Sequence, residues 1–243
     1  MPHLSSRRDS GFTLIEAMVV TAILSVITMG VVTYMSTVND IVSGETLQGV
    51  LEVNSSRVAN EIAERVADGL IWTPTTIPFN TTLIGIENPV DLDGDGTVLD
   101  AAGNVEFGVR IPGGAGAAYP ARMYYYLSLY PSGDPRYRVY ESNVGDINGD
   151  GDTYDYFYRG VIRRYIYIPS PNYLYNNAPI VTDVLWGDCD GDGQWDYPFS
   201  MSADNVLTVK IFVFGMDAKA RPMVIKSETQ TVVRGQWGTP SAP

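Results

Sequence analysis

Histidine and cysteine are almost absent from this sequence, which contains one of each, His3 and Cys189. Because His3 lies at the extreme N-terminus, the rest of the chain offers no Ser-His-Asp or Cys-His pair and no histidine-bearing zinc site. This absence excludes most hydrolase chemistry, and we expect a protein that is not an enzyme. A single cysteine cannot form an internal disulfide, so Cys189 is a free or intermolecular thiol, and we expect it to point outward.

Basic residues are also scarce, with 16 Lys and Arg against 28 Asp and Glu and a net charge of −12. Nucleic-acid binding is disfavoured, because phosphate affinity depends on clustered Lys and Arg. The glycine-rich segment 112–118 lacks the Gly-Lys-Ser/Thr of a phosphate-binding loop, so it predicts no nucleotide site. A chain of 243 residues with 45% hydrophobic content can bury the core of one globular domain.

One long hydrophobic run is present. Residues Ala17 to Val38 carry no charge, and at about 1.5 Å per helical residue they span roughly the 30 Å of a bilayer core. Glu16 directly precedes this run, where an ionisable group is costly and usually has a partner. Arg7 and Arg8 lie before it, on the side that the positive-inside bias keeps cytoplasmic. The sequence therefore predicts a single-pass membrane helix with the C-terminal bulk on the exported side.

The hexapeptide Gly11-Phe12-Thr13-Leu14-Ile15-Glu16, between a short basic leader and the apolar run, resembles the class III signal of type IV prepilins and type II secretion pseudopilins. An ordinary secretory signal has a shorter apolar core followed by a small-residue cleavage site. The resemblance implies that a prepilin peptidase cuts after Gly11 and methylates Phe12, and that Glu16 acts in assembly. It also implies an inner-membrane protein with a periplasmic domain, an assembly platform as partner, and other pilin or pseudopilin subunits as neighbours in a filament.

After the anchor, apolar residues continue at spacings of three and four, which predicts an amphipathic helix over residues 39–72. Gly44 and the segment Asn54-Ser55-Ser56 predict a local weakness or break in it. Beyond Pro74 the pattern changes to β-type runs separated by turn residues. The expected strands are Val105–Ile111, Met123–Tyr130, Arg136–Glu141, Tyr154–Ile168, Leu207–Phe214 and Met223–Val233.

These patterns and the family resemblance together predict an α+β fold, in which one long N-terminal helix packs on an antiparallel sheet. The expected organisation is a leader (1–11), a transmembrane and assembly helix (12–38), an amphipathic helix (39–72), a β-rich globular domain (73–234) and a loose tail (235–243). The ending Lys226–Gly235, after a long β region, loosely resembles the larger minor subunits, the J-type pseudopilins and W-type minor pilins.

Three segments repeat one acidic pattern: Asp91–Gly96, Asp146–Gly151 and Asp188–Gly193. Each has oxygen side chains at positions 1, 3 and 5 and Gly at position 6, as in loops that fold around calcium. An EF-hand has Glu at position 12, whereas this chain has earlier acids, which predicts compact loops with affinities on the order of 0.1 to 1 mM. Asp-Gly is also ordinary turn chemistry, which remains an alternative. The candidate calcium ligands are Asp91, Asp93, Asp95, Asp100, Asp146, Asn148, Asp150, Asp152, Asp155, Asp188, Asp190, Asp192 and Asp196.

The sequence is best interpreted as a structural minor subunit of a type IV pilus or type II secretion pseudopilus, with calcium stabilising its globular domain. An alternative is a calcium-dependent, glycan-binding adhesin on such a filament, because tyrosines gather at 124–126 and 154–158. Those tyrosines also fit simple packing within amphipathic strands. Acid-base catalysis by the aspartates is disfavoured, because no nucleophile or pocket motif accompanies them.

Overall fold

The computed structural model describes residues 13–72, 79–110, 118–119, 121–168 and 173–233. The expected leader 1–11, the processing residues Gly11 and Phe12, and the tail 235–243 lie outside the described residues. The chain divides into two compact units, residues 1–45 and 46–243.

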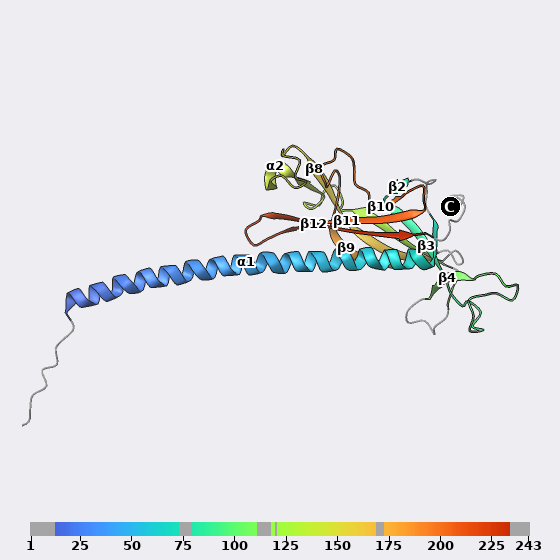
Figure 1. The fold of residues 1–243 in the computed structure, drawn as a ribbon, viewed down its shortest axis with the longest axis horizontal. Coiled ribbons are helices and arrows are strands. Elements are labelled where there is room, and N and C mark those ends of the chain that lie inside the picture. The colour runs from blue at the N-terminus through green and yellow to red at the C-terminus, as the bar shows by residue number, and fades with distance from the viewer. Residues whose placement is uncertain (1–12, 73–78, 111–117, 120, 169–172, 234–243) are drawn as a thin grey trace, which may run out of the picture. The chain divides into compact units, whose positions relative to one another are not determined.

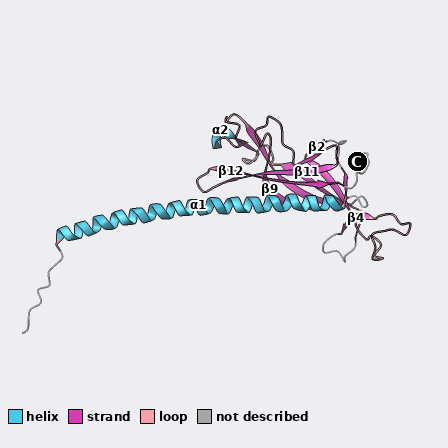
Figure 2. Cartoon of the chain, viewed as in Figure 1, coloured by secondary structure: helices cyan, strands magenta, loops and turns pink. Residues whose placement is uncertain are grey.

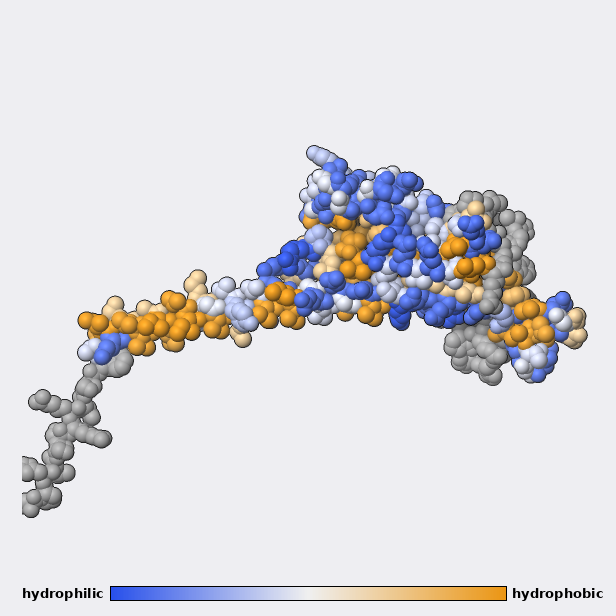
Figure 3. Space-filling view, in the orientation of Figure 1, coloured by the Kyte–Doolittle hydropathy of each residue, from blue (hydrophilic) through white to orange (hydrophobic). Residues whose placement is uncertain are grey.

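The first unit consists, in its described part, of the N-terminal portion of helix α1 (Leu14–Asp68). Among the described residues, α1 is the one helix that is long and apolar enough to cross a membrane, and no part of its most apolar stretch is buried within the chain. Apolar side chains cover this stretch on the face that Figure 3 shows. A helix that exposes so much apolar surface requires lipid or neighbouring chains around it.

Helix α1 continues without interruption past Gly44 and Asn54, so the expected break is wrong. The reason lies in the second unit, where Ser55 is buried. Its hydroxyl lies 2.8 Å from the Leu51 carbonyl and 2.6 Å from the Ser227 hydroxyl. The hydroxyl therefore has partners both within the helix and on β12, so the polar side chain is satisfied at a buried helical position.

The helix ends at Asp68, before the expected residue 72, and Leu70–Trp72 form strand β1. Gly69 marks the change, because a Cβ atom there would lie 2.7 Å from the Glu87 carbonyl oxygen. Only glycine allows the helix end to approach the sheet this closely.

All strand pairings among the described residues are antiparallel. The sheet runs in the order β2-β10-β11-β9-β8-β6-β3-β4-β5, with β1 on β3, β12 on β11 and β7 on β8. Figures 1 and 2 show its strands beside the C-terminal part of α1. The remaining strands are β2 (Phe79–Thr81), β3 (Leu83–Pro89), β4 (Phe107–Arg110), β5 (Ala118–Tyr119), β6 (Arg122–Leu129), β7 (Arg138–Tyr140), β8 (Tyr156–Ile168), β9 (Tyr173–Trp186), β10 (Phe199–Met201), β11 (Val206–Met216) and β12 (Pro222–Val232).

The C-terminal part of α1 packs on this sheet and forms the main core. Its contacting residues recur at helical spacing, and they are Val58, Ala59, Ile62 and Val66. On β11 the odd-numbered residues Leu207 to Val213 belong to the same core. The predicted α+β class, a long helix on an antiparallel sheet, is confirmed.

The even-numbered residues Phe212 and Phe214 of β11 belong to a second, smaller core. Because side chains alternate between the faces of a strand, this second core lies on the face opposite α1. It contains Phe157 and Cys189, with Ile147 packed against it. The second and third acidic loops therefore cover the sheet face that α1 leaves free.

Each of the six expected strands has an observed counterpart, whereas the long strand β9 and the shorter strands β1, β2, β3, β5 and β10 were not expected. The sequence of β9 includes Asn176, Asn177 and Pro179, which usually indicate turns. These residues are accommodated because the β8–β9 pairing shifts register at several points, and Asp183 adopts a φ of 59°. Such bulges allow turn-forming residues within a paired strand.

Candidate functional site

The three acidic loops share one local conformation. In each, the first aspartate accepts two backbone N–H groups from within its own loop, as Asp146 does from Gly149 at 2.7 Å and Gly151 at 3.1 Å. Asp91 accepts from Gly94 and Gly96, and Asp188 accepts from Asp192 and Gly193. The glycines at positions 4 and 6 all have positive φ, which explains why the repeated spacing requires glycine there.

The first loop is largely exposed. One carboxylate oxygen from each of Asp91, Asp93 and Asp95 lies within 4.8 Å of the other two. Asp100 is outside this group, because it accepts the backbone N–H of Ala102 and of Asn104 and closes its own turn. The side-chain amide of Asn104 also donates to this carboxylate and is the largest cause of the lowered pKa of Asp100, and the backbone hydrogen bonds lower the pKa further.

The second and third loops contact each other. The Asn148 amide donates to the Asp188 carbonyl oxygen at 3.2 Å. A Cβ atom at Gly191 would lie 3.3 Å from the Asn148 carbonyl oxygen and 3.2 Å from the Asp150 Cβ. The position-2 residues Ile147 and Cys189 join the second core, so both loops are anchored to the same face of the sheet.

The second acidic group contains a residue that the sequence pattern missed. Its carboxylates, again within 4.8 Å of one another, belong to Glu141, Asp152 and Asp155. Glu141 begins the short helix α2 (Glu141–Val144) and is 0% exposed. Its Oε1 accepts the backbone N–H of Ile147 at 2.7 Å, whereas its Oε2 has no hydrogen-bond partner among the described residues.

Burial dominates the electrostatics of this second group. Burial raises the pKa of Glu141, and the nearby carboxylates of Asp146 and Asp155 raise it further. The pKa of Asp155 is also raised, first by burial and then by Asp152 and other neighbouring aspartates. Both raised pKa values mean that the ionised carboxylates of Glu141 and Asp155 are disfavoured when no cation is nearby. The signal for Glu141 in the sequence is slight: an acid at the end of an expected strand, five residues before the loop.

The third group, Asp188, Asp190 and Asp196, differs because it contains a cation from the protein itself. Lys210 of β11 donates to the Asp190 carboxylate at 2.7 Å and also to Asp196. Burial raises the pKa of Asp196 although the lysine opposes the shift. The Lys210 ammonium therefore compensates the negative charge of these carboxylates, a role that a bound metal ion would otherwise have.

The predicted ligands thus separate into members of the three groups and residues that build the loops. The acids outside the groups are Asp100, Asp146, Asp150 and Asp192. Asp150 accepts the backbone N–H of Asp152, and Asp192 accepts that of Gln194. Asn148 bridges the second and third loops.

Cys189 is only 4% exposed, so the expectation that it points outward is wrong. Position 2 of the loop faces the sheet, and Cys189 therefore packs as a small apolar residue in the second core. Burial and the carboxylates of Asp196 and Asp188 raise the pKa of its thiol.

Tyrosines occupy both core and surface. Tyr125 is fully buried, as strand packing predicts, whereas Tyr154 is 90% exposed. Trp195, just after the third loop, is half-exposed, and its ring centroid lies 4.9 Å from that of Trp186. The Tyr158 ring contacts both tryptophans. Tyr158, Trp186 and Trp195 thus form an aromatic cluster beside the third loop, in which Tyr158 and Trp186 are half-buried and Trp195 is exposed.

At the start of α1, Thr13 and Glu16 form a reciprocal cap. The Thr13 backbone N–H and hydroxyl both donate to Glu16 Oε2 at 2.9 Å, and the Glu16 N–H lies 3.3 Å from the Thr13 hydroxyl. This is a capping box, and its signal in the sequence is the Thr-x-x-Glu spacing of Thr13 and Glu16. Glutamine can serve the same local role.

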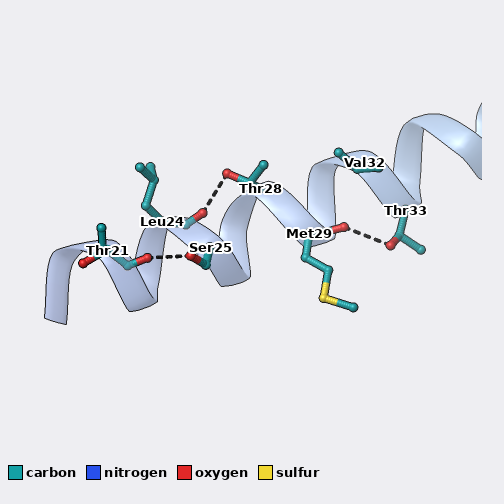
Figure 4. A pocket seen from close by; sticks show the side chains of 7 residues that line it. All are labelled: Thr21, Leu24, Ser25, Thr28, Met29, Val32 and Thr33. Atoms are coloured by element: carbon teal, nitrogen blue, oxygen red, sulfur yellow. Dashed lines mark hydrogen bonds between the residues drawn. The ribbon is translucent and has the colours of Figure 1, made fainter. Parts of the chain in front are cut away.

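Hydroxyl side chains line one stretch of the apolar helix. Ser25, Thr28 and Thr33 each donate to the carbonyl oxygen four residues earlier, at 2.8 to 2.9 Å (Figure 4). The hydroxyls are satisfied within the helix, as lipid requires. Small polar residues of this kind also favour close packing between membrane helices.

Comparisons with known proteins locate the similarity at the N-terminus. Residues 6–32 match the family described as the prokaryotic N-terminal methylation motif. Neither a curated protein nor a solved structure gives a significant match to the chain. The matched segment contains the part of the leader with Arg7 and Arg8, the Gly11–Glu16 hexapeptide and most of the apolar run. It supports the identification of this chain as a type IV pilin-like protein, anchored in a membrane by the apolar helix.

Proposed function

We propose that the protein is a structural, non-catalytic minor subunit of a type IV pilus or a type II secretion pseudopilus, of the J or W type. The observation that carries the proposal is the methylation motif at the start of an apolar helix, whose most apolar stretch is not buried by any of the residues that the structure describes. Before assembly this helix lies in the inner membrane, with the globular domain on the periplasmic side. In the filament, helices of neighbouring subunits replace the lipid.

Glu16 is the proposed assembly residue. Cleavage after Gly11 by the prepilin peptidase would leave a charged amine at Phe12, close to the same membrane interface. Pairing of one subunit's Glu16 with a neighbour's Phe12 amine would remove two costly unpaired charges and set the axial register between the helices.

The capping box makes a sharp test possible. Glu16→Gln keeps an acceptor for the Thr13 N–H but removes the charge, whereas Thr13→Ala removes the cap and keeps the charge. The pairing proposal expects normal processing of both variants and severe loss of the Gln variant alone from sheared filaments. If Glu16 only caps the helix, Thr13→Ala should be lost from the filaments and Glu16→Gln should be incorporated normally. Wild-type incorporation of Glu16→Gln would overturn the pairing.

Processing is tested separately by intact-mass analysis of membrane-extracted protein. The expected species lacks Met1–Gly11 and carries one methyl group on Phe12. Assembled protein that retains its leader would contradict the assignment to this class of subunit.

We further propose that calcium stabilises the globular domain, on the support of three carboxylate groups built on calcium-type spacing. A ligand at 100 times its Kd adds about 2.7 kcal/mol when it binds only the folded state. Melts of the detergent-extracted chain should therefore differ by several degrees between calcium and chelator. Identical curves without bound metal would refute this part.

A second candidate function is glycan binding on the filament, favoured by the aromatic cluster. Exposed aromatic rings stack on the apolar faces of sugars, and the exposed Tyr154 and Trp195 follow the second and third acidic loops closely. If the protein is an adhesin, the wild type should bind to a glycan array only when calcium is present, and Trp195→Ala should abolish this binding. Equal retention of the two proteins would exclude a role for this cluster.

A further inference from the structure

The three acidic groups differ in how their charge is compensated. The first is exposed to solvent, and the third contains Lys210. In the part of the chain that the structure describes, no ion pair joins Glu141, Asp152 or Asp155 to a basic side chain. The second group therefore gathers three carboxylates, one of them fully buried, without an internal cation.

Glu141 supplies an observation independent of the loop pattern. Its side chain is 0% exposed, and its Oε2 is a buried oxygen without a hydrogen-bond donor among the described residues. A buried carboxylate oxygen that lacks a donor is strongly destabilising, and native structures rarely contain one unless an ion or water completes it. The unpaired oxygen belongs to a residue whose carboxylate already lies beside Asp152 and Asp155.

The backbone holds Glu141 in this place. Its N–H donates to the Asp155 carbonyl oxygen at 3.1 Å, and its Oε1 accepts the N–H of Ile147. The start of α2, the loop and the residues leading into β8 are thereby tied together around the carboxylates. The side chain is positioned before any ligand binds, which lowers the ordering cost of binding.

We propose that Glu141, Asp152 and Asp155 are ligands of a calcium ion that closes the second acidic loop onto the sheet. This inference rests on the calcium part of the proposed function and deepens it by naming the site and a ligand outside the repeated pattern. An all-oxygen, carboxylate-rich set suits a hard cation such as calcium and lacks the nitrogen and sulfur donors that zinc or copper prefer. Because Asn148 contacts Asp188, the bound ion also steadies the third loop.

The test uses the full chain in detergent, stripped with chelator and then titrated with calcium chloride in equilibrium dialysis. Glu141→Gln should lose one bound calcium, or weaken one site at least tenfold. Asp134→Asn is the matched control, because it also removes one negative charge but alters a carboxylate that pairs with Arg136 outside the three groups. The control should bind calcium as the wild type does.

Stability supplies a second readout that a merely structural role would not produce. In chelator, Glu141→Gln should melt at or above the wild-type temperature, because it removes an uncompensated buried charge and keeps an acceptor for the Ile147 N–H. In saturating calcium, it should melt below the wild type. A variant that melts lower in both conditions by the same amount would indicate packing alone and overturn the inference.

Asp155→Asn repeats the test without touching the buried side chain of Glu141, should that variant fail to fold. Unchanged calcium binding by Glu141→Gln, or by Asp155→Asn in its place, overturns this site but leaves calcium binding by the other groups intact. A wild-type chain that binds no calcium overturns both this inference and the calcium part of the function. The filament proposal is judged independently, by the Glu16 and Thr13 variants.

Discussion

Lys210 is the residue whose replacement has the clearest expected effect on stability. Its ammonium pairs with Asp190 and Asp196 in the third acidic group, and the side chains are 19%, 30% and 10% exposed. Lys210→Met keeps an unbranched apolar side chain but removes the ammonium, which forms the ion pairs and lies 5.2 Å from the centroid of the Phe212 ring. Three neighbouring carboxylates are then left without a cation.

The magnitude follows from burial. Removing one partner of a fully buried ion pair costs about 3 to 5 kcal/mol, whereas an exposed pair contributes about 0 to 1 kcal/mol. The side chains of this ion-pair group are mostly buried but still touch solvent. We therefore expect Lys210→Met to lower the free energy of unfolding by about 2 to 3 kcal/mol in the presence of chelator. For a domain of this size, each kcal/mol lowers Tm by roughly 2 to 4 °C, which gives a decrease of about 4 to 12 °C.

The assay is thermal unfolding of the detergent-extracted chain, followed in chelator and again in calcium. Removal of the lysine frees the third group for a metal, so calcium at 100 times its Kd should return about 2.7 kcal/mol, close to the whole loss. Lys226→Met is the matched control, since its pair with Glu228 is substantially exposed. That variant should lose less than about 1 kcal/mol and show no added response to calcium.

Two results would refute this reasoning. If Lys210→Met melts like the wild type in chelator, then the lysine does not compensate the third group. If the variant is destabilised but calcium stabilises it no more than the wild type, then the ammonium and a metal do not compete for the same carboxylates.

Two further predictions concern packing. Gly160→Ala should cost about 1 to 3 kcal/mol in denaturant unfolding, because a Cβ there would lie 2.5 Å from the Ser128 carbonyl oxygen of β6, whereas Gly133→Ala, which meets nothing within 4 Å, should be near neutral. The Cys189 thiol should react slowly with iodoacetamide in the native chain and quickly after unfolding, since it is buried and its pKa is raised. Rapid native labelling would contradict the packing of the third loop on the sheet.

The features that the sequence determines are those whose causes lie within a few residues. The uncharged run after Glu16 predicts its own helix, because in lipid every backbone group must bond within the segment. The helical spacing of Val58, Ile62 and Val66 predicts the buried stripe of α1, which the structure confirms. The acidic loops are equally local, since the first aspartate of each accepts backbone N–H groups three to five residues away.

The features that only the tertiary structure decides arise from residues far apart in the chain. Ser55 does not break α1, because its hydroxyl forms a hydrogen bond with that of Ser227, which lies 172 residues later in the chain. Strand β9 forms despite Pro179, because its pairing with β8 shifts register at several points. The difference between the second and third acidic groups depends on Glu141 and Lys210, which lie outside the repeated pattern. Burial and charge compensation are set by what packs around a residue, so three loops with the same local sequence acquire different chemistry only when the sheet brings these side chains to them.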